Sequence, residues 1–63
     1  MMLEAVWLKD GKEVWKVSPV MNLLCDENMK DITEIEVSNG YDWYGVEDLG
    51  IEADDFVIRI KRD

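Results

Sequence analysis

The sequence contains no histidine, only one cysteine and only one proline. Histidine is the side chain that most often moves protons in catalysis and binds zinc, so its absence removes the commonest catalytic and metal-binding chemistry. Cys25 cannot form an internal disulfide and has no histidine to complete a zinc site within one chain. We interpret Cys25 as a small apolar residue, with a reactive thiol as the alternative. We expect no enzymatic activity, no metal site and no cofactor.

The sequence also lacks a long apolar run, because acids and lysines interrupt its first fifteen residues. This pattern argues against a signal peptide or a membrane span, and we expect a cytoplasmic protein. With 63 residues, the chain is expected to form one compact domain, 1–63, near the lower size limit for a single hydrophobic core. The three tryptophans and the other aromatic residues must therefore supply much of the buried area.

Basic residues are scarce: seven Lys and Arg stand against fifteen Asp and Glu, which gives a net charge of −8. Residues 26–55 hold eleven of the acids and a single lysine, whereas residues 1–25 are balanced. A field of this sign repels nucleic acid and anionic lipid and attracts basic protein surfaces. We expect a basic protein surface as the partner, with no direct binding of nucleic acid or membrane.

Residues 3–18 have the pattern of a β-hairpin, with strand-forming residues on both sides of "KDGK". A two-residue loop, Asp10-Gly11, would place Lys9 opposite Lys12 and scatter the apolar residues over both faces. A three-residue loop with a left-handed Gly11 instead pairs Glu4 with Lys16 and keeps one apolar face. We predict the second register, with an apolar face of Leu3, Ala5, Trp7, Trp15 and Val17.

The segment after this hairpin begins with a helix-start signal, Ser18 as N-cap and Pro19 at the first helical position. Val20, Leu23 and Leu24 follow at helical spacing, so we predict a short helix that packs on the sheet and also carries Cys25. The polar stretch from Asp26 to Asp31 then ends this helix or forms a loop.

A second hairpin is predicted around Asn39-Gly40. A three-residue loop would pair Val37 with Tyr41 and Ile35 with Trp43 on an inward face. Glu36 and Asp42, then Glu34 and Tyr44, would fall on the outward face.

The last third of the sequence predicts a loop and one strand. Residues 46–55 form the loop, with one helical turn at residues 46–49 as an alternative, and "DFVIRIKRD" is the strand. Phe56, Ile58 and Ile60 share one face of this strand, while Val57, Arg59 and Lys61 share the other. The expected fold class is a small single α+β domain, ββαβββ, in which two β-hairpins and a C-terminal strand form an antiparallel sheet with one short helix packed on it.

The candidate site is an acidic face on the second hairpin and the loop after it. Small viral proteins that imitate the DNA phosphate backbone are also compact and acidic, and they occupy the basic groove of a nucleic-acid-binding enzyme; the likeness is one of charge and size. We predict a non-enzymatic interaction protein of this viral or mobile-element type, an inhibitor or regulator that docks its acidic face on a basic protein, with Tyr44 as the anchor. The predicted partner-binding residues are Glu34, Glu36, Asp42, Tyr44, Glu47, Asp48, Glu52, Asp54 and Asp55.

Four alternatives stay open. The acids could simply solvate a small protein, or the carboxylates of residues 47–55 could bind a divalent cation weakly. The small core and the apolar strand "FVIRI" favour a self-associating structural protein, in which a second copy adds to the edge of a sheet. The aromatic residues could instead line a small-molecule pocket.

Overall fold

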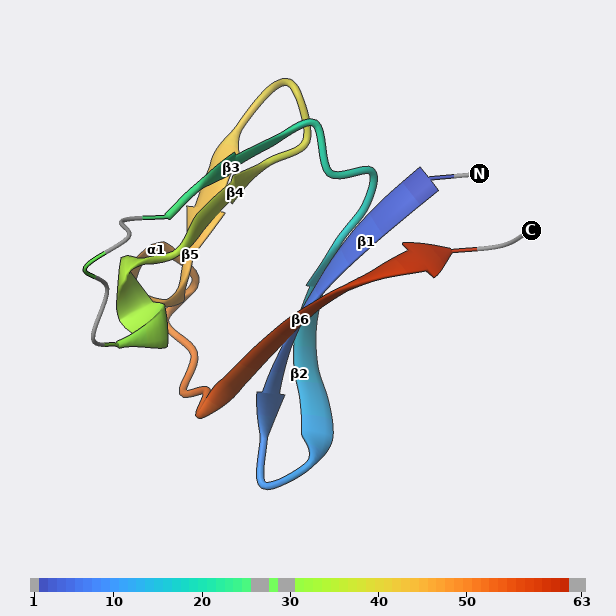
Figure 1. The fold of residues 1–63 in the computed structure, drawn as a ribbon. Helices are drawn as coiled ribbons and strands as arrows, with labels where there is room; N and C mark the ends of the chain where they lie inside the picture. Colours follow the sequence, from blue (N-terminus) through green and yellow to red (C-terminus); the bar gives the residue numbers. More distant parts are fainter. Residues whose placement is uncertain (1, 26–27, 29–30, 62–63) are drawn as a thin grey trace.

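The computed structural model describes residues 2–25, 28 and 31–61. The chain forms two antiparallel three-stranded sheets and short helical turns (Figure 1), which confirms a small α+β domain built mostly of strands. Sheet A has the strand order β2-β1-β6, and sheet B has the order β3-β4-β5. The elements are β1 (Met2–Lys9), β2 (Lys12–Val17), β3 (Asn22–Leu24), η1 (Ile32–Glu34), β4 (Glu36–Ser38), β5 (Trp43–Gly45), α1 (Val46–Leu49) and β6 (Asp55–Lys61).

The first hairpin is present, but its loop is the two-residue alternative. Lys9 pairs with Lys12 across Asp10 and Gly11, whose positive φ angles of 53° and 80° suit the tight turn. The predicted three-residue loop is therefore wrong. The predicted pairing of Glu4 with Lys16 is also wrong, since Lys16 pairs with Val6. The predicted apolar residues still share one face, where Ala5 pairs with Val17 and Trp7 with Trp15, but Leu3 and Trp15 are exposed.

A β-bulge reconciles this loop with the apolar face. The register shifts between Trp7 and Leu8, where Trp7 pairs with Trp15 but Leu8 pairs with Glu13. Val14 is the extra residue on β2, and it resets which side chains face the core. Glu13 consequently lies on the outer face with Leu8, while Trp15 lies on the same face as Trp7 and is 43% exposed.

The segment after Ser18 is a strand and not the predicted helix. A cis Ser18-Pro19 bond leads into β3, which pairs with β4, and the backbone N–H of Met21 donates to the carbonyl of Ser38 at 2.8 Å. The Ser-Pro signal failed because the same dipeptide also serves in turns, and apolar residues this close together fit a short strand equally well. Cys25 follows β3 and is exposed. Residues 26–27 and 29–30 of the predicted polar loop lie outside the described residues.

The second hairpin has a four-residue loop, and its register differs from the predicted one by an odd number of residues. Val37 pairs with Tyr44, and Ser38 pairs with Trp43. The Asn39 side-chain carbonyl accepts from the backbone N–H groups of Tyr41 and Asp42, at 2.9 and 3.0 Å, and thereby fixes the longer loop. An odd shift exchanges the two faces of a strand.

The exchange of faces overturns the predicted orientation of all three rings. Tyr44 turns inward and packs against the core, whereas Tyr41 and Trp43 are 92% and 48% exposed.

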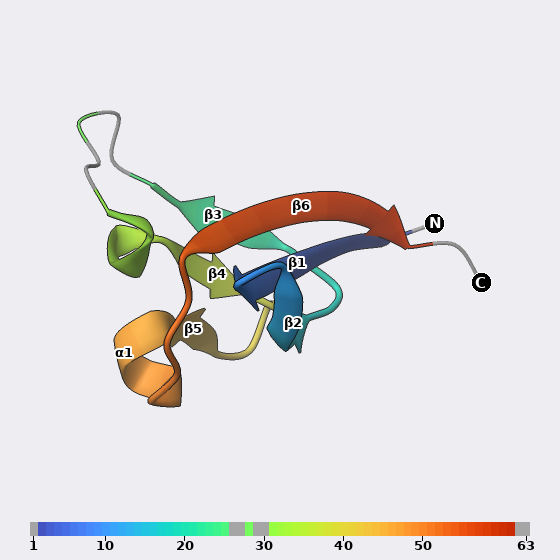
Figure 2. The same cartoon turned by 90° about the horizontal axis from the view of Figure 1, so that it is seen from below.

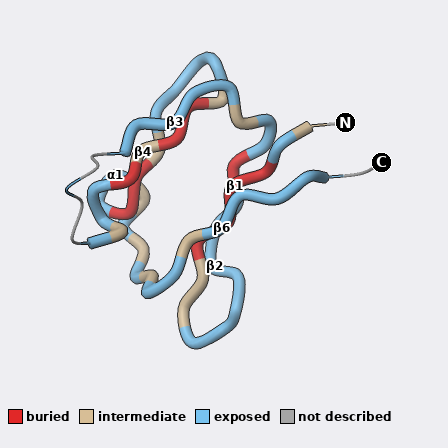
Figure 3. Tube along the Cα trace, viewed as in Figure 1, coloured by how far each residue is buried: buried red, intermediate tan, exposed pale blue. Residues whose placement is uncertain are grey.

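The last strand agrees with the sequence pattern. β6 pairs with β1 over its whole length, and Phe56 lies opposite Trp7, with the two ring centroids 5.1 Å apart. Residues of both sheets and the start of α1 form the core, and Figure 3 marks the buried stretches along the chain. The buried apolar residues of this core are Ala5, Trp7, Val17, Ile35, Val37 and Val46.

Candidate functional site

Two short helical elements hold the first acidic residues of the candidate site. α1 carries Glu47 and Asp48 in its only turn, and η1 carries Glu34. Figures 1 and 2 show α1 and the neighbouring η1 turn at the end of the molecule away from the C-terminal end of β6. All three carboxylates are exposed, so they present negative charge together at this end.

A glycine next to α1 brings Glu36 into the same group. Glu36 of β4 pairs with Gly45, the residue that precedes α1. A Cβ atom at Gly45 would lie 3.5 Å from Cγ of Glu36 and 3.7 Å from Oδ2 of Asp48. The side chains of Glu36 and Asp48 therefore approach the same backbone position. We call Glu34, Glu36, Glu47 and Asp48 the α1 acidic face.

The other predicted acids lie elsewhere. Just before β6, Asp54 Oδ2 accepts from the backbone N–H of Asp10 at 3.1 Å, which places Asp54 beside the β1–β2 turn. Lys9 and Lys12 pair across that turn, so Asp54 lies close to two basic residues. The remaining predicted acids are exposed at separate places: Asp42 in the β4–β5 turn, Glu52 between α1 and β6, and Asp55 at the first position of β6.

The aromatic residue beside the acids is Trp43 and not Tyr44. Tyr44 faces Val37 and the core, and its hydroxyl accepts from Asn39 Nδ2 at 3.4 Å. Trp43 pairs with Ser38, so it shares the outer face of sheet B with Glu36, two residues before Ser38 on β4. Sequence reasoning missed Trp43 because it assumed a three-residue loop, whereas Asn39 was the signal for the longer one.

The cations that form ion pairs lie on the outer face of sheet A. Arg59 donates to Oε1 of Glu4 at 2.9 Å and to Oε1 of Glu13 at 2.7 Å. Lys16 Nζ lies 3.6 Å from Glu13 and 4.0 Å from Glu4. The hydrogen bond from Arg59, helped by the charges of Arg59 and Lys16, lowers the pKa of Glu13 below its ordinary value. The bonds to Glu4 and Glu13 raise the pKa of Arg59. These four residues form a neutral ion cluster.

No ion pair of the candidate-site acids is found among the described residues. Within residues 2–25, 28 and 31–61, every ion pair belongs to this ion cluster, and none involves a carboxylate between Glu34 and Asp55. No group of three or more Cys, Asp or Glu side chains in that part of the chain is arranged to hold a metal ion. A divalent site at residues 47–55 therefore gains no support.

Comparisons with known proteins give no information about the function of the chain. No family model, curated protein or solved structure matches the chain. The helices of the described residues are single turns, and none is long and apolar enough to cross a membrane.

Proposed function

We propose that the protein is a non-enzymatic interaction module that binds a basic protein surface through the α1 acidic face, with Trp43 as the apolar anchor. The observation that carries this proposal is the separation of charge. The ion-paired cations neutralise Glu4 and Glu13 on sheet A, while Glu34, Glu36, Glu47 and Asp48 stand together without a cation among the described residues. Carboxylates that have no ion pair among the described residues and are held by short, packed elements suit a cationic partner.

The position of Trp43 supports a contact surface over a merely solvated one. Interface hot spots are enriched in tryptophan, tyrosine and arginine, and they are ringed by polar residues that exclude water. Trp43 is about half exposed on the strand face that also carries Glu36. The basic partner is proposed to be a nucleic-acid-binding protein, whose groove for a phosphate backbone would accept the carboxylates.

The test is capture of the partner from the native host, followed by affinity measurement with the purified partner. The test variant Glu36→Gln/Glu47→Gln/Asp48→Asn removes three charges from the α1 acidic face. The matched control Asp10→Asn/Asp54→Asn/Asp55→Asn removes three charges near the β1–β2 turn. We expect the test variant to lose most of the affinity and the control to keep it. Raising the salt concentration should weaken wild-type binding roughly tenfold or more, because exposed charge pairs are screened.

Three results separate the parts of this proposal. Affinity that does not change with salt would show that the acidic-face mechanism is wrong. Equal losses in both variants would assign binding to the net charge and not to the α1 acidic face. If duplex DNA does not compete for the captured partner, the partner is not a nucleic-acid-binding protein. The proposal of a basic partner would still stand.

A further inference from the structure

The free edge of sheet A is a second surface with the properties of an interface. Among the described residues β6 pairs only with β1, so its other side is a sheet edge. Every residue of β6 except Phe56 is exposed, including Ile58 at 39% and Ile60 at 51%. An exposed apolar edge strand is a template for adding another strand.

The backbone groups at this edge can be identified from two hydrogen bonds of β1. The carbonyl of Leu8 accepts from the N–H of Asp54 at 2.8 Å and so faces β6. The carbonyl of Leu3 accepts from the N–H of Val20 at 2.9 Å, on the β2 side. Successive residues of a strand direct their backbone groups to alternate neighbours, so even-numbered residues of β1 bond to β6.

The register between β1 and β6 then fixes which groups of β6 point outward. Leu8 pairs with Asp55 and Val6 with Val57, so odd-numbered residues of β6 bond to β1. The backbone groups of Phe56, Ile58 and Ile60 consequently point to the open edge. In agreement, the N–H of Phe56 donates to the Asp55 side chain at 2.8 Å.

We propose that a second copy of this chain docks on β6, antiparallel, with the two Ile58 residues opposite each other. In this register Phe56 faces the partner's Ile60, and Asp55 faces the partner's Lys61. The outward backbone groups of Ile58 and Ile60 find partners, and the N–H of Phe56 exchanges its bond to the Asp55 side chain for one to the partner's Ile60. The Asp55 carboxylate is then free to meet an ammonium group, at both ends of the pair. Cross-strand pairs of opposite charge stabilise a sheet, so the strand is complementary to itself.

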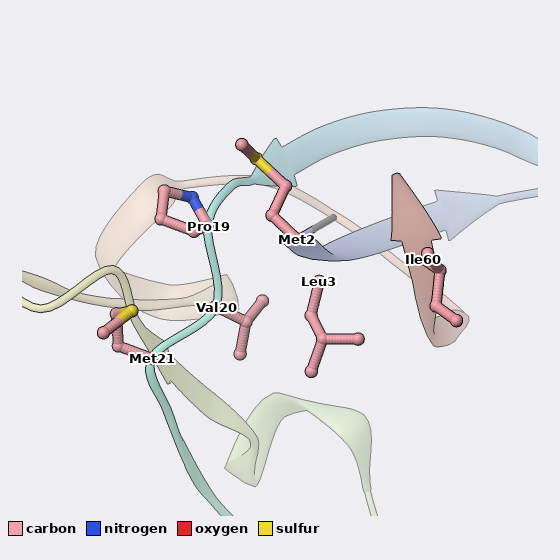
Figure 4. A pocket seen from close by; sticks show the side chains of 6 residues that line it. All are labelled: Met2, Leu3, Pro19, Val20, Met21 and Ile60. Carbon is pink, nitrogen blue, oxygen red and sulfur yellow. The ribbon is translucent and has the colours of Figure 1, made fainter. Parts of the chain in front are cut away.

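The two-fold axis of such a pair also covers apolar surface. It runs perpendicular to the sheet, so the inward faces of both copies stay on the same side. Figure 2 shows β3 along the same side of the molecule as β6, and a groove of about 480 Å³ lies between Ile60 of β6 and the segment before β3 (Figure 4). The residues that line this groove are Met2, Leu3, Pro19, Val20, Met21 and Ile60. The second copy would continue the apolar face beside this groove.

The first experiment tests the charge pairs by sedimentation equilibrium over a dilution series. Lys61→Glu places two carboxylates together at each end and should raise the dimer dissociation constant roughly two- to thirtyfold, as two cross-strand pairs predict. The exchange Asp55→Lys/Lys61→Glu restores the pairs and should return the dissociation constant close to the wild-type value. Lys12→Glu makes the same charge change on β2 and should have little effect.

Two results would overturn the inference in this experiment. The first is a wild-type chain that stays monomeric up to millimolar concentration. The second is a dimer that responds equally to Lys61→Glu and Lys12→Glu, because the charge pairs would then not exist.

The second experiment locates the two-fold axis. Opposite residues in a hydrogen-bonded antiparallel pair have Cα atoms about 5.5 Å apart, within the span of a disulfide. In a Cys25→Ser background, Ile58→Cys should therefore form a covalent dimer rapidly on mild oxidation. Val14→Cys, on the opposite edge of sheet A and also 39% exposed, should not. Equal cross-linking rates for the two variants would show that another surface is used. The same conclusion would follow if the chain sediments as a dimer but the Ile58→Cys variant forms no disulfide between copies.

Discussion

At the residue scale, Glu4 is the carboxylate that depends most on its surroundings. It lies on the outer face of the central strand β1, yet only 4% of its surface is exposed. A buried carboxylate is costly unless it is paired and hydrogen-bonded. Arg59, opposite it on β6, supplies the bond and also reaches Glu13 on β2. One guanidinium thus ties all three strands of sheet A together.

Replacement of Arg59 tests this role. Arg59→Met keeps the apolar stem but removes the charge, so Glu4 is left buried with only Lys16 at 4.0 Å. We expect a lower free energy of unfolding at pH 7, measured by urea denaturation. Lys61→Met, the next basic residue on the same face of β6, should cost much less, because Lys61 has no ion pair among the described residues.

The pH dependence of stability provides a second readout of this Arg59→Met variant. The pKa of Glu13 is lowered in the folded protein, so Glu13 contributes stability above its ordinary pKa of 4.5, and this contribution is lost as the pH falls through the folded pKa. Without Arg59, the largest cause of the shift is gone, and the loss of stability below pH 4.5 should be smaller. An acid response identical to that of the wild type would contradict the assigned bond.

At the element scale, the bulge at Val14 lets a tight loop and a one-sided core coexist. A two-residue loop continued without a bulge would turn Trp15 away from Trp7. The extra residue restores the pairing of Trp7 with Trp15 while Glu13 still reaches Arg59 on the outer face. Bulges that re-aim side chains in this way are designed features of a sheet.

Deletion of Val14 should therefore be tolerated. Without it, Glu13 and Trp15 become neighbours on opposite faces, and the pairs on both sides of the bulge join into a regular ladder. We expect a loss of about 1 to 2 kcal/mol in unfolding free energy, ordinary for a single change. Deletion of Lys16 shifts Val17 out of the core face and should abolish cooperative unfolding. If the Val14 deletion is as damaging as the Lys16 deletion, the bulge has another role.

The first hairpin also shows how much of the fold the sequence could predict. Alternation of apolar residues predicted the two strands of the first hairpin and both faces of β6, because each strand places alternate side chains on one buried face. It failed for β3, whose residues Asn22–Leu24 were predicted to be helical. Alternation does not reveal the length of a loop. The bulge at Val14 decides the register of the β1–β2 hairpin, and the side-chain bonds of Asn39 decide that of the β4–β5 hairpin. For the candidate site, the predicted acids are exposed except Glu36, which is half-buried, but the wrong register chose Tyr44 where Trp43 is the exposed ring.

At the scale of the whole molecule, the charges are separated by position. Balanced charge lies on the outer face of sheet A, and unbalanced negative charge lies around α1. With a net charge of −8 on 63 residues, the α1 acidic face adds to a field that opposes the compact state. A surface that serves binding commonly lowers the stability of the unbound protein in this way.

Thermal unfolding as a function of salt tests this cost. Between about 20 mM and about 500 mM salt the repulsion is progressively screened, so we expect the Tm of the wild-type protein to rise by several degrees, since about 1 kcal/mol moves Tm by about 4–8 °C in a domain of this size. Glu36→Gln/Glu47→Gln/Asp48→Asn should have the higher Tm at low salt and a smaller salt response. Asp10→Asn/Asp54→Asn/Asp55→Asn should gain less, because Lys9 and Lys12 lie near those acids. A lower Tm for the first variant at low salt would mean that the α1 acidic face stabilises the fold, and that its charges serve the structure and not a partner.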